Sequence, residues 1–464
     1  MHLLPQLREL EHRFGEALVI VGVHAGKFIA ERVTENIRQA VIRLGVEHPV
    51  VNDRQYRIWR SYAVNAWPTL VLVSVEGRVV GQHVGETTAD ALAPVVERTI
   101  AAAEETGALD RTRLTFPLER DAEPERALRY PAKVAGDPAT RRLAISDTGH
   151  SRVLLVRLDP GGRGGEVEAV VGRGERGFDD GAHDVATFDD PHGLAFGDGV
   201  LYVADTGNHA LRAVERRGRW RVRTVAGTGE QAGRLGVPGQ GRAVALNSPW
   251  DVLFHGGALY IAMAGPHQIW RFDFETGEVL PWAGTGVEAL LDGRRGEAAL
   301  AQPSGLATDG RRIFFADAEA SAIRWAEIGP AGRVGTIVGT GLFDFGDRDG
   351  SGDQVRLQHP LGVAWRDGIL YVADTYNGKV KVLDPETRTA VTWIGTDAGE
   401  VGGVAGARGT GSRLGAGGSA RILWEPGGIA TLEGWVYVAD TNHHRVVVAR
   451  PGADTVEELE IRGV

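Results

Sequence analysis

Short apolar runs, each introduced by a proline, recur six times between residue 131 and the C-terminus. In every copy a second apolar run follows and ends at a fixed motif position. The six prolines are Pro131, Pro191, Pro249, Pro303, Pro360 and Pro426. The six motif positions are Asp147, Asp205, Met263, Asp317, Asp374 and Asp440. Two further apolar runs complete each repeat. Four short strands copied six times predict an all-β, six-bladed β-propeller.

The connections between these strands place several loops on one face. If the strands of a blade are A to D from the axis outward, the loop into A and the loop between B and C lie at the same end, because successive strands alternate in direction. Asp-Gly pairs at 180–181, 292–293 and 349–350 fall in loops of the first kind and favour tight turns. We therefore expect any axial binding site on this shared rim, since loops on a rigid scaffold carry function.

The pattern leaves the closure of the ring open. Thr455–Ile461 has the pattern of the missing outer strand of the last blade, and Leu114–Leu118 is an alternative closing strand. The glycine-rich run from Gly399 to Gly418 is interpreted as an insertion in a blade, because it lacks the strand–helix context of a nucleotide-binding loop.

The first hundred residues show a different order of elements. The predicted elements are a helix over Leu3–Phe14, a strand over Leu18–Val23, a helix over Glu31–Leu44, a strand over His48–Val51, a helix over Tyr56–Tyr62, strands over Leu70–Val75 and Arg78–Val84, and a helix from Thr88 to about Glu104. This order predicts an α/β, thioredoxin-like domain that is incomplete, because no strand precedes the first helix. Pro68, directly before a central strand, is expected to be cis. The alternative is a trans proline that starts an edge strand.

These patterns predict three segments: a thioredoxin-like domain over residues 1–106, a linker over 107–126 and a propeller over 127–464. The formal net charge of −10 argues against nucleic-acid partners, which are bound through Lys and Arg. The chain has no cysteine, which excludes thiolate catalysis, disulfides and cysteine-ligated metals. No signal peptide or apolar run of membrane-spanning length is visible, so we expect a cytoplasmic protein with no membrane partner.

Several longer stretches resemble a known family. They are Val21–Phe28, His48–Asp53, Trp67–Thr69, Leu246–Asp251, Ala262–Trp270, Ala301–Leu306, Leu342–Asp347 and Leu357–Val363. Together they resemble the NHL repeat-containing protein 2-like family, with its bacterial relatives, in which a thioredoxin-like (redoxin) domain precedes a six-bladed NHL propeller. In that family a Cys-x-x-Cys motif directly precedes a stretch similar to Met1–Pro5. The resemblance implies that the chain is truncated at its N-terminus or lacks this redox segment.

The repeated aspartates Asp147, Asp205, Asp317, Asp374 and Asp440 are interpreted as structural. A residue repeated around a ring is expected to make turns or to pair with a nearby cation, here Arg152, Arg212, Arg324, Lys381 or Arg445. Four residues after the motif position, three blades carry His209, His267 and His444, which are candidate ligands of a divalent metal. The alternating oxygens of Asp347, Asp349 and Asp353 resemble a calcium loop that lacks its closing Glu.

The third repeat departs from the others. Met263 replaces the aspartate, and Trp250, His267 and Trp270 lie close to it in sequence. Departures from a repeat point to function more strongly than agreement with it. The candidate rim-binding residues are therefore His192, Trp250, His267, Trp270 and His359.

No catalytic set assembles from the sequence, and we expect no cofactor. The predicted function is a non-catalytic scaffold whose propeller rim engages a protein or peptide, next to a redox-inactive thioredoxin-like domain. One alternative is a thiol–disulfide or peroxide-type oxidoreductase, if the native N-terminus carries Cys-x-x-Cys. Another is a metal-dependent lyase or hydrolase on the rim, an activity that the resemblance to other NHL propellers suggests.

Overall fold

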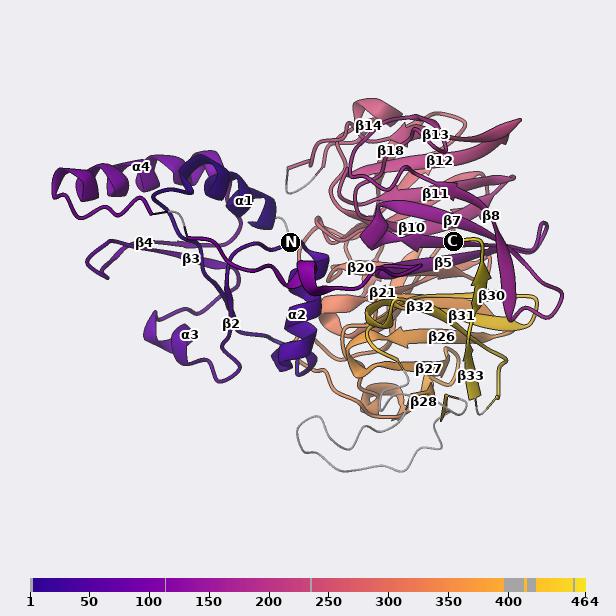
Figure 1. Ribbon diagram of the computed structural model, residues 1–464. Helices are drawn as coiled ribbons and strands as arrows, with labels where there is room; N and C mark the ends of the chain where they lie inside the picture. The colour runs from indigo at the N-terminus through magenta and orange to yellow at the C-terminus, as the bar shows by residue number, and fades with distance from the viewer. Residues whose placement is uncertain (1–2, 113, 234–235, 396–412, 415–422, 454) are drawn as a thin grey trace. The chain divides into compact units, whose positions relative to one another are not determined.

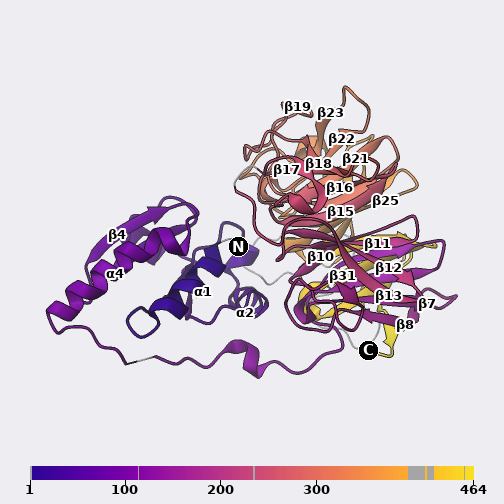
Figure 2. The same cartoon turned by 90° about the horizontal axis from the view of Figure 1, so that it is seen from above.

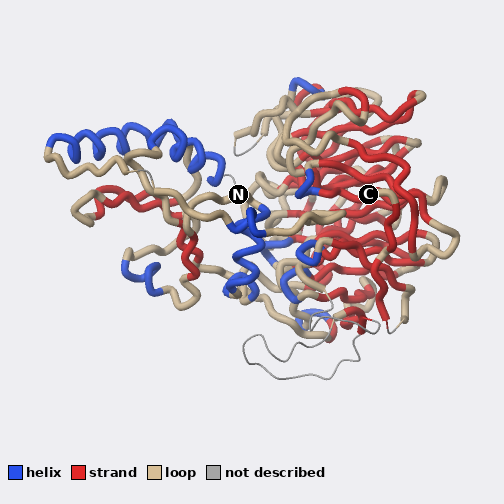
Figure 3. Tube along the Cα trace, viewed as in Figure 1, coloured by secondary structure: helices blue, strands red, loops and turns tan. Residues whose placement is uncertain are grey.

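The computed structural model describes residues 3–112, 114–233, 236–395, 413–414, 423–453 and 455–464 (Figure 1). The chain divides into two compact units, Met1–Glu125 and Arg126–Val464. Long helices belong to the first unit, and the second consists mainly of strands (Figure 3). Of the glycine-rich run 399–418, all but Arg413 and Leu414 lies outside the described residues, as do Met1 and His2.

The N-terminal unit follows the order of elements that the sequence predicts. Its elements are α1 (Leu3–Phe14), β1 (Gly22–His24), η1 (Ala30–Arg32), α2 (Thr34–Arg43), β2 (Val50–Asn52), α3 (Arg57–Ser61), β3 (Thr69–Val73), β4 (Val79–Val84) and α4 (Ala89–Glu105). Among the described residues the strands form two separate two-stranded sheets, a parallel pair of β1 with β2 and an antiparallel pair of β3 with β4. The predicted first strand is shorter than expected, because only its last two residues and His24 pair with β2.

Helix α4 packs on the rest of this unit through one apolar face. Its buried side chains are Ala89, Ala93, Val96 and Ala103. The hydroxyl of Thr88 caps the helix by accepting the N–H of Ala91 at 3.3 Å, and the side chain of Gln6 in α1 accepts the N–H of Ala89 at 2.9 Å. A side chain of α1 thus binds the first turn of α4.

The second unit contains six blades of four main strands each, as the repeat predicts. Blade 1 has β5 (Pro131–Asp137), β6 (Arg142–Asp147), β7 (Arg152–Leu158) and β8 (Gly164–Val171). Blade 2 has β10 (Pro191–Gly197), β11 (Val200–Asp205), β12 (Ala210–Arg217) and β13 (Arg219–Ala226). Blade 3 has β15 (Pro249–His255), β16 (Ala258–Met263), β17 (Gln268–Asp273) and β18 (Glu278–Ala283).

Blades 4 to 6 repeat the same order. Blade 4 has β20 (Pro303–Thr308), β21 (Arg312–Asp317), β22 (Ala322–Glu327) and β23 (Arg333–Val338). Blade 5 has β25 (Gly362–Arg366), β26 (Ile369–Asp374), β27 (Lys379–Asp384) and β28 (Thr389–Ile394). Blade 6 has β30 (Pro426–Leu432), β31 (Trp435–Asp440), β32 (Arg445–Ala449) and β33 (Thr455–Glu458).

The innermost strands β5, β10, β15, β20, β25 and β30 surround one axis. Each contacts the innermost strands of both neighbouring blades, and β30 contacts β5 (Figures 1 and 2). Apolar side chains from adjacent blades fill the wedges between them. One such cluster joins Leu211 of blade 2 to Ile261 and Trp270 of blade 3. A six-bladed propeller is therefore confirmed.

Each blade also has a short fifth strand at its outer edge, which the repeat does not predict. In blades 2 to 6 these are β9 (Gly181–Ala182), β14 (Gly239–Gln240), β19 (Gly293–Arg294), β24 (Gly350–Ser351) and β29 (Arg413–Leu414). They come from the loop that precedes the innermost strand of the same blade. In blade 1 the fifth strand is β34 (Glu460–Arg462), which pairs in parallel with β8.

This pairing settles the closure of the ring. Strand β33 supplies the outer strand of blade 6, and β34 then crosses to the edge of blade 1. The alternative was wrong, because Leu114–Leu118 forms no strand. Within the described residues no helix is both long and apolar enough to cross a lipid bilayer.

Candidate functional site

The rim of the propeller is built from two repeated backbone features. The residue before each blade proline has a positive φ, which turns the chain into the innermost strand; these residues are Tyr130, Asp190, Ser248, Gln302, His359 and Glu425. The residue four places after the motif position also has a positive φ; these residues are Ser151, His209, His267, Ser321, Gly378 and His444. Both sets lie at the same end of the strands, because Pro and motif residue pair directly, as Pro191 does with Asp205.

The repeated aspartates join the two features. One carboxylate oxygen of each accepts the backbone N–H of the residue two places before the blade proline, at 2.6 to 2.8 Å. The pairs are Asp147 with Arg129, Asp205 with Asp189, Asp317 with Ala301, Asp374 with Gln358, and Asp440 with Trp424. All five side chains are fully buried. The bonds tie the loop into the innermost strand to the end of the second strand of the same blade.

Four of the five aspartates also bind the cation that the sequence suggests. The ion pairs are Arg152–Asp147, Arg212–Asp205, Arg324–Asp317 and Arg445–Asp440, with N–O distances of 2.7, 2.6, 2.8 and 2.9 Å. In blade 5 the ammonium of Lys381 instead donates to Asp347 and Asp349, at 2.8 and 2.7 Å. Burial raises the pKa of Asp374 to about 7, although the nearby Lys381 opposes this shift.

The three candidate metal-ligating histidines make inter-blade hydrogen bonds. Nδ1 of His209 accepts the N–H of Ser248 at 3.0 Å, Nδ1 of His267 that of Gln302 at 3.2 Å, and Nδ1 of His444 that of Tyr130 at 3.1 Å. Each acceptor lies in one blade and each donor in the next. A nitrogen that accepts an N–H offers no lone pair to a metal ion. Across the described part of the chain, no three His, Asp or Glu side chains come together as a metal site.

The three carboxylates of the predicted calcium loop face cations rather than one another. Asp347 pairs with Lys379 and Lys381, Asp349 with Lys381, and Asp353 with Arg388. Burial disfavours the charged forms of Asp347 and Asp349, but Lys381 outweighs it and holds both pKa values below their ordinary value. The calcium interpretation does not fit this geometry, because lysine and arginine occupy the positions that an ion would need.

Of the candidate rim-binding residues, His192 and Trp250 come together at the axis. Each directly follows a blade proline, and their ring centroids lie 4.3 Å apart, with both residues half-buried. His359 stacks instead on Tyr376 of its own blade, at 4.5 Å. Trp270 was wrongly assigned to the rim. It lies on the third strand of blade 3 and is fully buried, with its indole N–H donated to Gln268 at 3.0 Å.

Below this pair lies an ion pair that the sequence reasoning missed. Lys133 of blade 1 and Asp251 of blade 3 meet in the axial channel at an N–O distance of 3.4 Å, and both are buried. The Lys133 ammonium also donates to the carbonyl of Leu361, and Asp251 accepts the N–H of Leu306 at 3.1 Å. Burial lowers the pKa of Lys133 and raises that of Asp251, while each partner opposes the shift of the other. This axial ion pair links four blades.

A signal for it was present in the repeat. The second residue after the blade proline is glycine in four blades (Gly193, Gly305, Gly362 and Gly428) and charged in the other two. A Cβ at Gly193 would lie 2.4 Å from Cα of Asp251, and one at Gly428 would lie 2.6 Å from Cα of Lys133. The four glycines therefore let the innermost strands approach the propeller axis closely. The side chains of Lys133 and Asp251, which carry opposite charges, fill the remaining space in the axial channel. The channel here has a cavity of about 190 Å³.

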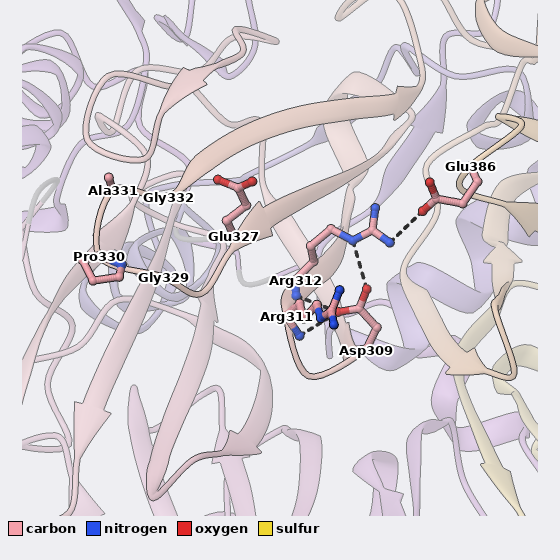
Figure 4. Close-up of a pocket in the computed structure, with 9 residues that line it drawn as sticks. All are labelled: Asp309, Arg311, Arg312, Glu327, Gly329, Pro330, Ala331, Gly332 and Glu386. Atoms are coloured by element: carbon pink, nitrogen blue, oxygen red, sulfur yellow. Dashed lines mark hydrogen bonds and ion pairs between the residues drawn. The ribbon is translucent and has the colours of Figure 1, made fainter.

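A second cavity opens on the opposite face of the propeller, between blades 4 and 5 (Figure 4). It has a volume of about 560 Å³ and is lined by turns that connect strands A to B and C to D. Arg312 crosses it and binds Asp309 and Glu386, both at 2.9 Å. Because Asp309 belongs to blade 4 and Glu386 to blade 5, the guanidinium of Arg312 links the two blades.

In the N-terminal unit the Trp67–Pro68 peptide bond is cis. The indole N–H of Trp67 donates to the carbonyl of Ala25 at 2.8 Å, and its ring lies 4.7 Å from that of Trp59. The loop before β3 is thus held to the loop after β1 by a hydrogen bond and to α3 by a ring contact.

Comparison with known proteins gives three findings. The NHL repeat family matches residues 188–213, which cover the first strands of blade 2. NHL repeat-containing protein 2 of Homo sapiens is 36% identical over 97% of this chain and 64% of its own length. The chloroplastic protein SUPPRESSOR OF QUENCHING 1 of Arabidopsis thaliana is 39% identical over 100% of this chain and 44% of its own length. The chain thus spans less than two thirds of both relatives.

Among solved structures, a gluconolactonase of Xanthomonas campestris aligns with a TM-score of 0.42 at 15% identity. The alignment covers 67% of this chain and 83% of that protein.

Proposed function

The chain belongs to the family of NHL repeat-containing protein 2, and on this basis we propose that it is a non-catalytic binding protein whose propeller rim engages a partner protein or peptide. The observation that carries the proposal is the location of exposed apolar side chains. Large exposed hydrophobic residues of the described propeller lie mostly in the loops that lead into successive blades: Val185, Val237, Val287, Leu291 and Phe343. Val237 and Phe343 are 77% and 74% exposed. We infer that these side chains, one or two from each of four loops, contribute to a protein-interaction surface on the face that the loops share.

The centre of the same face supports the proposal. His192 and Trp250 stand where the other blades have Ala132, Ser304, Leu361 and Gly427. The mouth of the axis is therefore bulky and aromatic on one side and small or aliphatic on the others. Half-buried tryptophan is enriched among residues that contribute most to binding energy at interfaces.

The ionisable groups of the rim also favour binding over catalysis. The repeated aspartates and the histidines that could serve as acid, base or metal ligand are engaged in bonds within or between blades. A general acid or base needs a proton site that substrate can reach.

Photo-crosslinking tests the proposal. A photoreactive phenylalanine analogue placed at Val237 or Phe343 should crosslink to the same partner protein in cells. The analogue placed at Val391, an exposed valine on an outer strand, is the matched control. Trp250→Ala combined with His192→Ala should reduce the crosslink from the rim positions. Equal crosslinking from Val391, or an unchanged yield in the double variant, would count against the rim.

For the N-terminal unit we propose a redox-inactive, thioredoxin-like domain over residues 1–106, joined by a linker over 107–126 to the propeller over 127–464. The order of helices and strands and the proline before β3 support it. The printed sequence has no cysteine, so its own residues provide no thiolate for disulfide exchange.

A further inference from the structure

A group of exposed arginines, with two half-buried aromatic rings and one exposed ring, lies on the N-terminal unit around α3. We define the arginine–aromatic surface as Arg54, Arg57 and Arg60 together with Tyr56, Trp59 and Trp67. Five of the six residues alternate in type along the segment Arg54–Arg60, and Trp67 follows one short loop later. Helix α3 lies at the periphery of its unit (Figure 1).

The aromatic half of this surface is held in a fixed arrangement. The rings of Tyr56 and Trp59 meet edge to face at 5.8 Å, and those of Trp59 and Trp67 lie 4.7 Å apart. Trp67 is 50% exposed although its indole N–H is bound to the carbonyl of Ala25. Its orientation is therefore set without a partner, so a side chain that packs on its open face would not have to order it first.

The charged half of the surface carries no matching carboxylates. Arg54, Arg57 and Arg60 are exposed, and within the described residues none of them forms an ion pair with a carboxylate, although the charge of Arg60 acts on Asp53 at longer range. The nearest acid in sequence, Asp53, is buried and uses both oxygens to accept the N–H groups of Arg57 and Trp59, at 2.7 and 2.8 Å.

Three other arginines of the same unit form ion pairs with carboxylates. Arg13 binds Glu97, Arg38 binds Glu119 and Glu123, and Arg120 binds Glu47. This unit thus pairs several of its arginines with carboxylates, whereas Arg54, Arg57 and Arg60 form no ion pair within the described residues and lie next to the aromatic cluster in sequence.

We propose that the arginine–aromatic surface binds an acidic peptide segment of a partner protein. Its Asp or Glu carboxylates pair with the three arginines, and an apolar or aromatic side chain beside them packs on Trp67. Guanidinium groups match carboxylates in bidentate geometry, and exposed tryptophan supplies contact area at low entropic cost. The net charge of −10 opposes the long phosphate backbone of a nucleic acid more than a short acidic peptide.

This surface goes beyond the rim proposal, because it lies on the other unit and neither depends on the other. The test uses the full chain and fluorescence anisotropy. The probes are a fluorescein-labelled twelve-residue peptide of Glu, Asp, Leu and Trp, the same peptide with Gln and Asn in place of the acids, and an oligothymidylate of equal length. The acidic peptide should bind, and its affinity should fall as salt rises from 50 to 300 mM.

The variant Arg57→Gln with Arg60→Gln should weaken binding of the acidic peptide about tenfold, since two exposed charge pairs are lost. Trp67→Ala should weaken it with little change in the salt dependence. Arg98→Gln, which removes an exposed arginine from α4, is the matched control and should leave affinity unchanged. Thermal unfolding of each variant checks that the unit stays folded.

Four results would overturn the proposal. They are absence of binding of the acidic peptide, equal binding of the Gln/Asn peptide, an equal loss of affinity in Arg98→Gln, and tighter binding of the oligothymidylate. The last of these would assign the surface to single-stranded nucleic acid.

Discussion

At the scale of single residues, the motif position shows three solutions to one packing problem. Blades 1, 2, 4 and 6 pair the buried aspartate with an arginine, which is fully buried in blades 2 and 4 alone, and blade 5 places a lysine among three aspartates. Blade 3 buries Met263 and, seven residues on, Trp270, where blades 2 and 4 have Arg212 and Arg324. Well-packed apolar residues can replace a buried ion pair without loss of stability. Blade 3 is therefore explained by packing, and Trp270 needs no separate function.

The buried pair of blade 4 makes a quantitative prediction. Arg324→Met should lower the free energy of unfolding by about 3–5 kcal/mol, because it leaves Asp317 buried without its cation. Arg152→Met in blade 1 is the matched control. Arg152 is 21% exposed, and Asp147 keeps a bond to His150, so the loss should be about 1–2 kcal/mol. Urea unfolding measures both, and equal losses would contradict the argument.

A second residue-scale prediction concerns the glycines of the axis. Gly193→Ala should cost about 1–3 kcal/mol of unfolding free energy, because the new methyl group would lie 2.4 Å from Cα of Asp251. Gly161→Ala has no atom within 4 Å of its added Cβ and should change stability by less than about 0.5 kcal/mol. Thermal unfolding of the two variants side by side decides whether the axis is as tightly packed as the distances indicate.

The sequence was sufficient for residues that obey the repeat. It predicted the structural role of the aspartates and four of their five cations, because a repeated Asp with a nearby Arg leaves few alternatives. It did not predict the bond between Lys133 and Asp251, since residues 118 positions apart meet only once six blades close. It also misplaced Trp270, because position in a repeat does not show which face of a strand is buried.

At the scale of elements, the turn between the second and third strands of a blade also forms a hydrogen bond to the next blade. Its last residue adopts a positive φ, and in three blades a histidine there accepts an N–H from the next blade. In blade 4 the hydroxyl of Ser321 accepts the N–H of His359 at 3.2 Å in the same way. One short turn therefore sets both the shape of its own blade and the register of its neighbour.

Blade 5 predicts a pH dependence of stability. The pKa of Asp374 is about 7 in the folded chain and 3.8 when unperturbed, because the carboxyl is buried and repelled by Asp347. Between these values the folded state holds a proton that the unfolded state has released. Stability should therefore fall as pH rises from about 4 to 7, by up to about 1.4 kcal/mol per pH unit, and level off above 7.

Asp374→Asn removes this proton and should flatten the slope between pH 5 and 7 relative to the native sequence. Asp384→Asn is the control, because hydrogen bonds from Thr387 hold the pKa of Asp384 below its ordinary value, outside that window. Chemical unfolding at four pH values from 5 to 8 gives the slopes. A slope that Asp374→Asn leaves unchanged would show that Asp374 does not titrate there.

The helices and main strands were predicted within a few residues, because these elements are long enough for their apolar residues to show a period. The fifth strands were not predicted. Each has only two residues in blades 2 to 6, and a two-residue strand has no measurable alternation. Their position depends on the loop returning along the outer strand, as Gly181 and Ala182 do against β13.

At the scale of the molecule, the junction of blades 6 and 1 brings together the last and the first blade of the chain. On the rim it uses the same bonds as the other junctions. Thr441 donates to the carbonyl of Pro131 at 2.8 Å, as Thr206 does to that of Pro249 at 2.6 Å, and His444 accepts the N–H of Tyr130. Its outer edge differs, because the fifth strand of blade 1 comes from the C-terminal end of the chain and not from the loop before β5.

Strand β34 fills that edge, and its removal should open the ring. A chain that ends at Leu459 loses the parallel pairing with β8, the packing of Ile461 on the core between blades 6 and 1, and the ion pair of Arg462 with Asp159 at 2.9 Å. Together these contacts should contribute about 2–4 kcal/mol to the free energy of unfolding. A chain that ends at Arg462 keeps all three and is the control. Hydrogen exchange should become faster in β8 and β5 of the shorter chain and stay slow in blades 3 and 4, because the lost contacts lie at the junction of blades 6 and 1 alone. If exchange in β8 is equally slow in both chains, the rim bonds of Thr441 and His444 close the ring without the last strand.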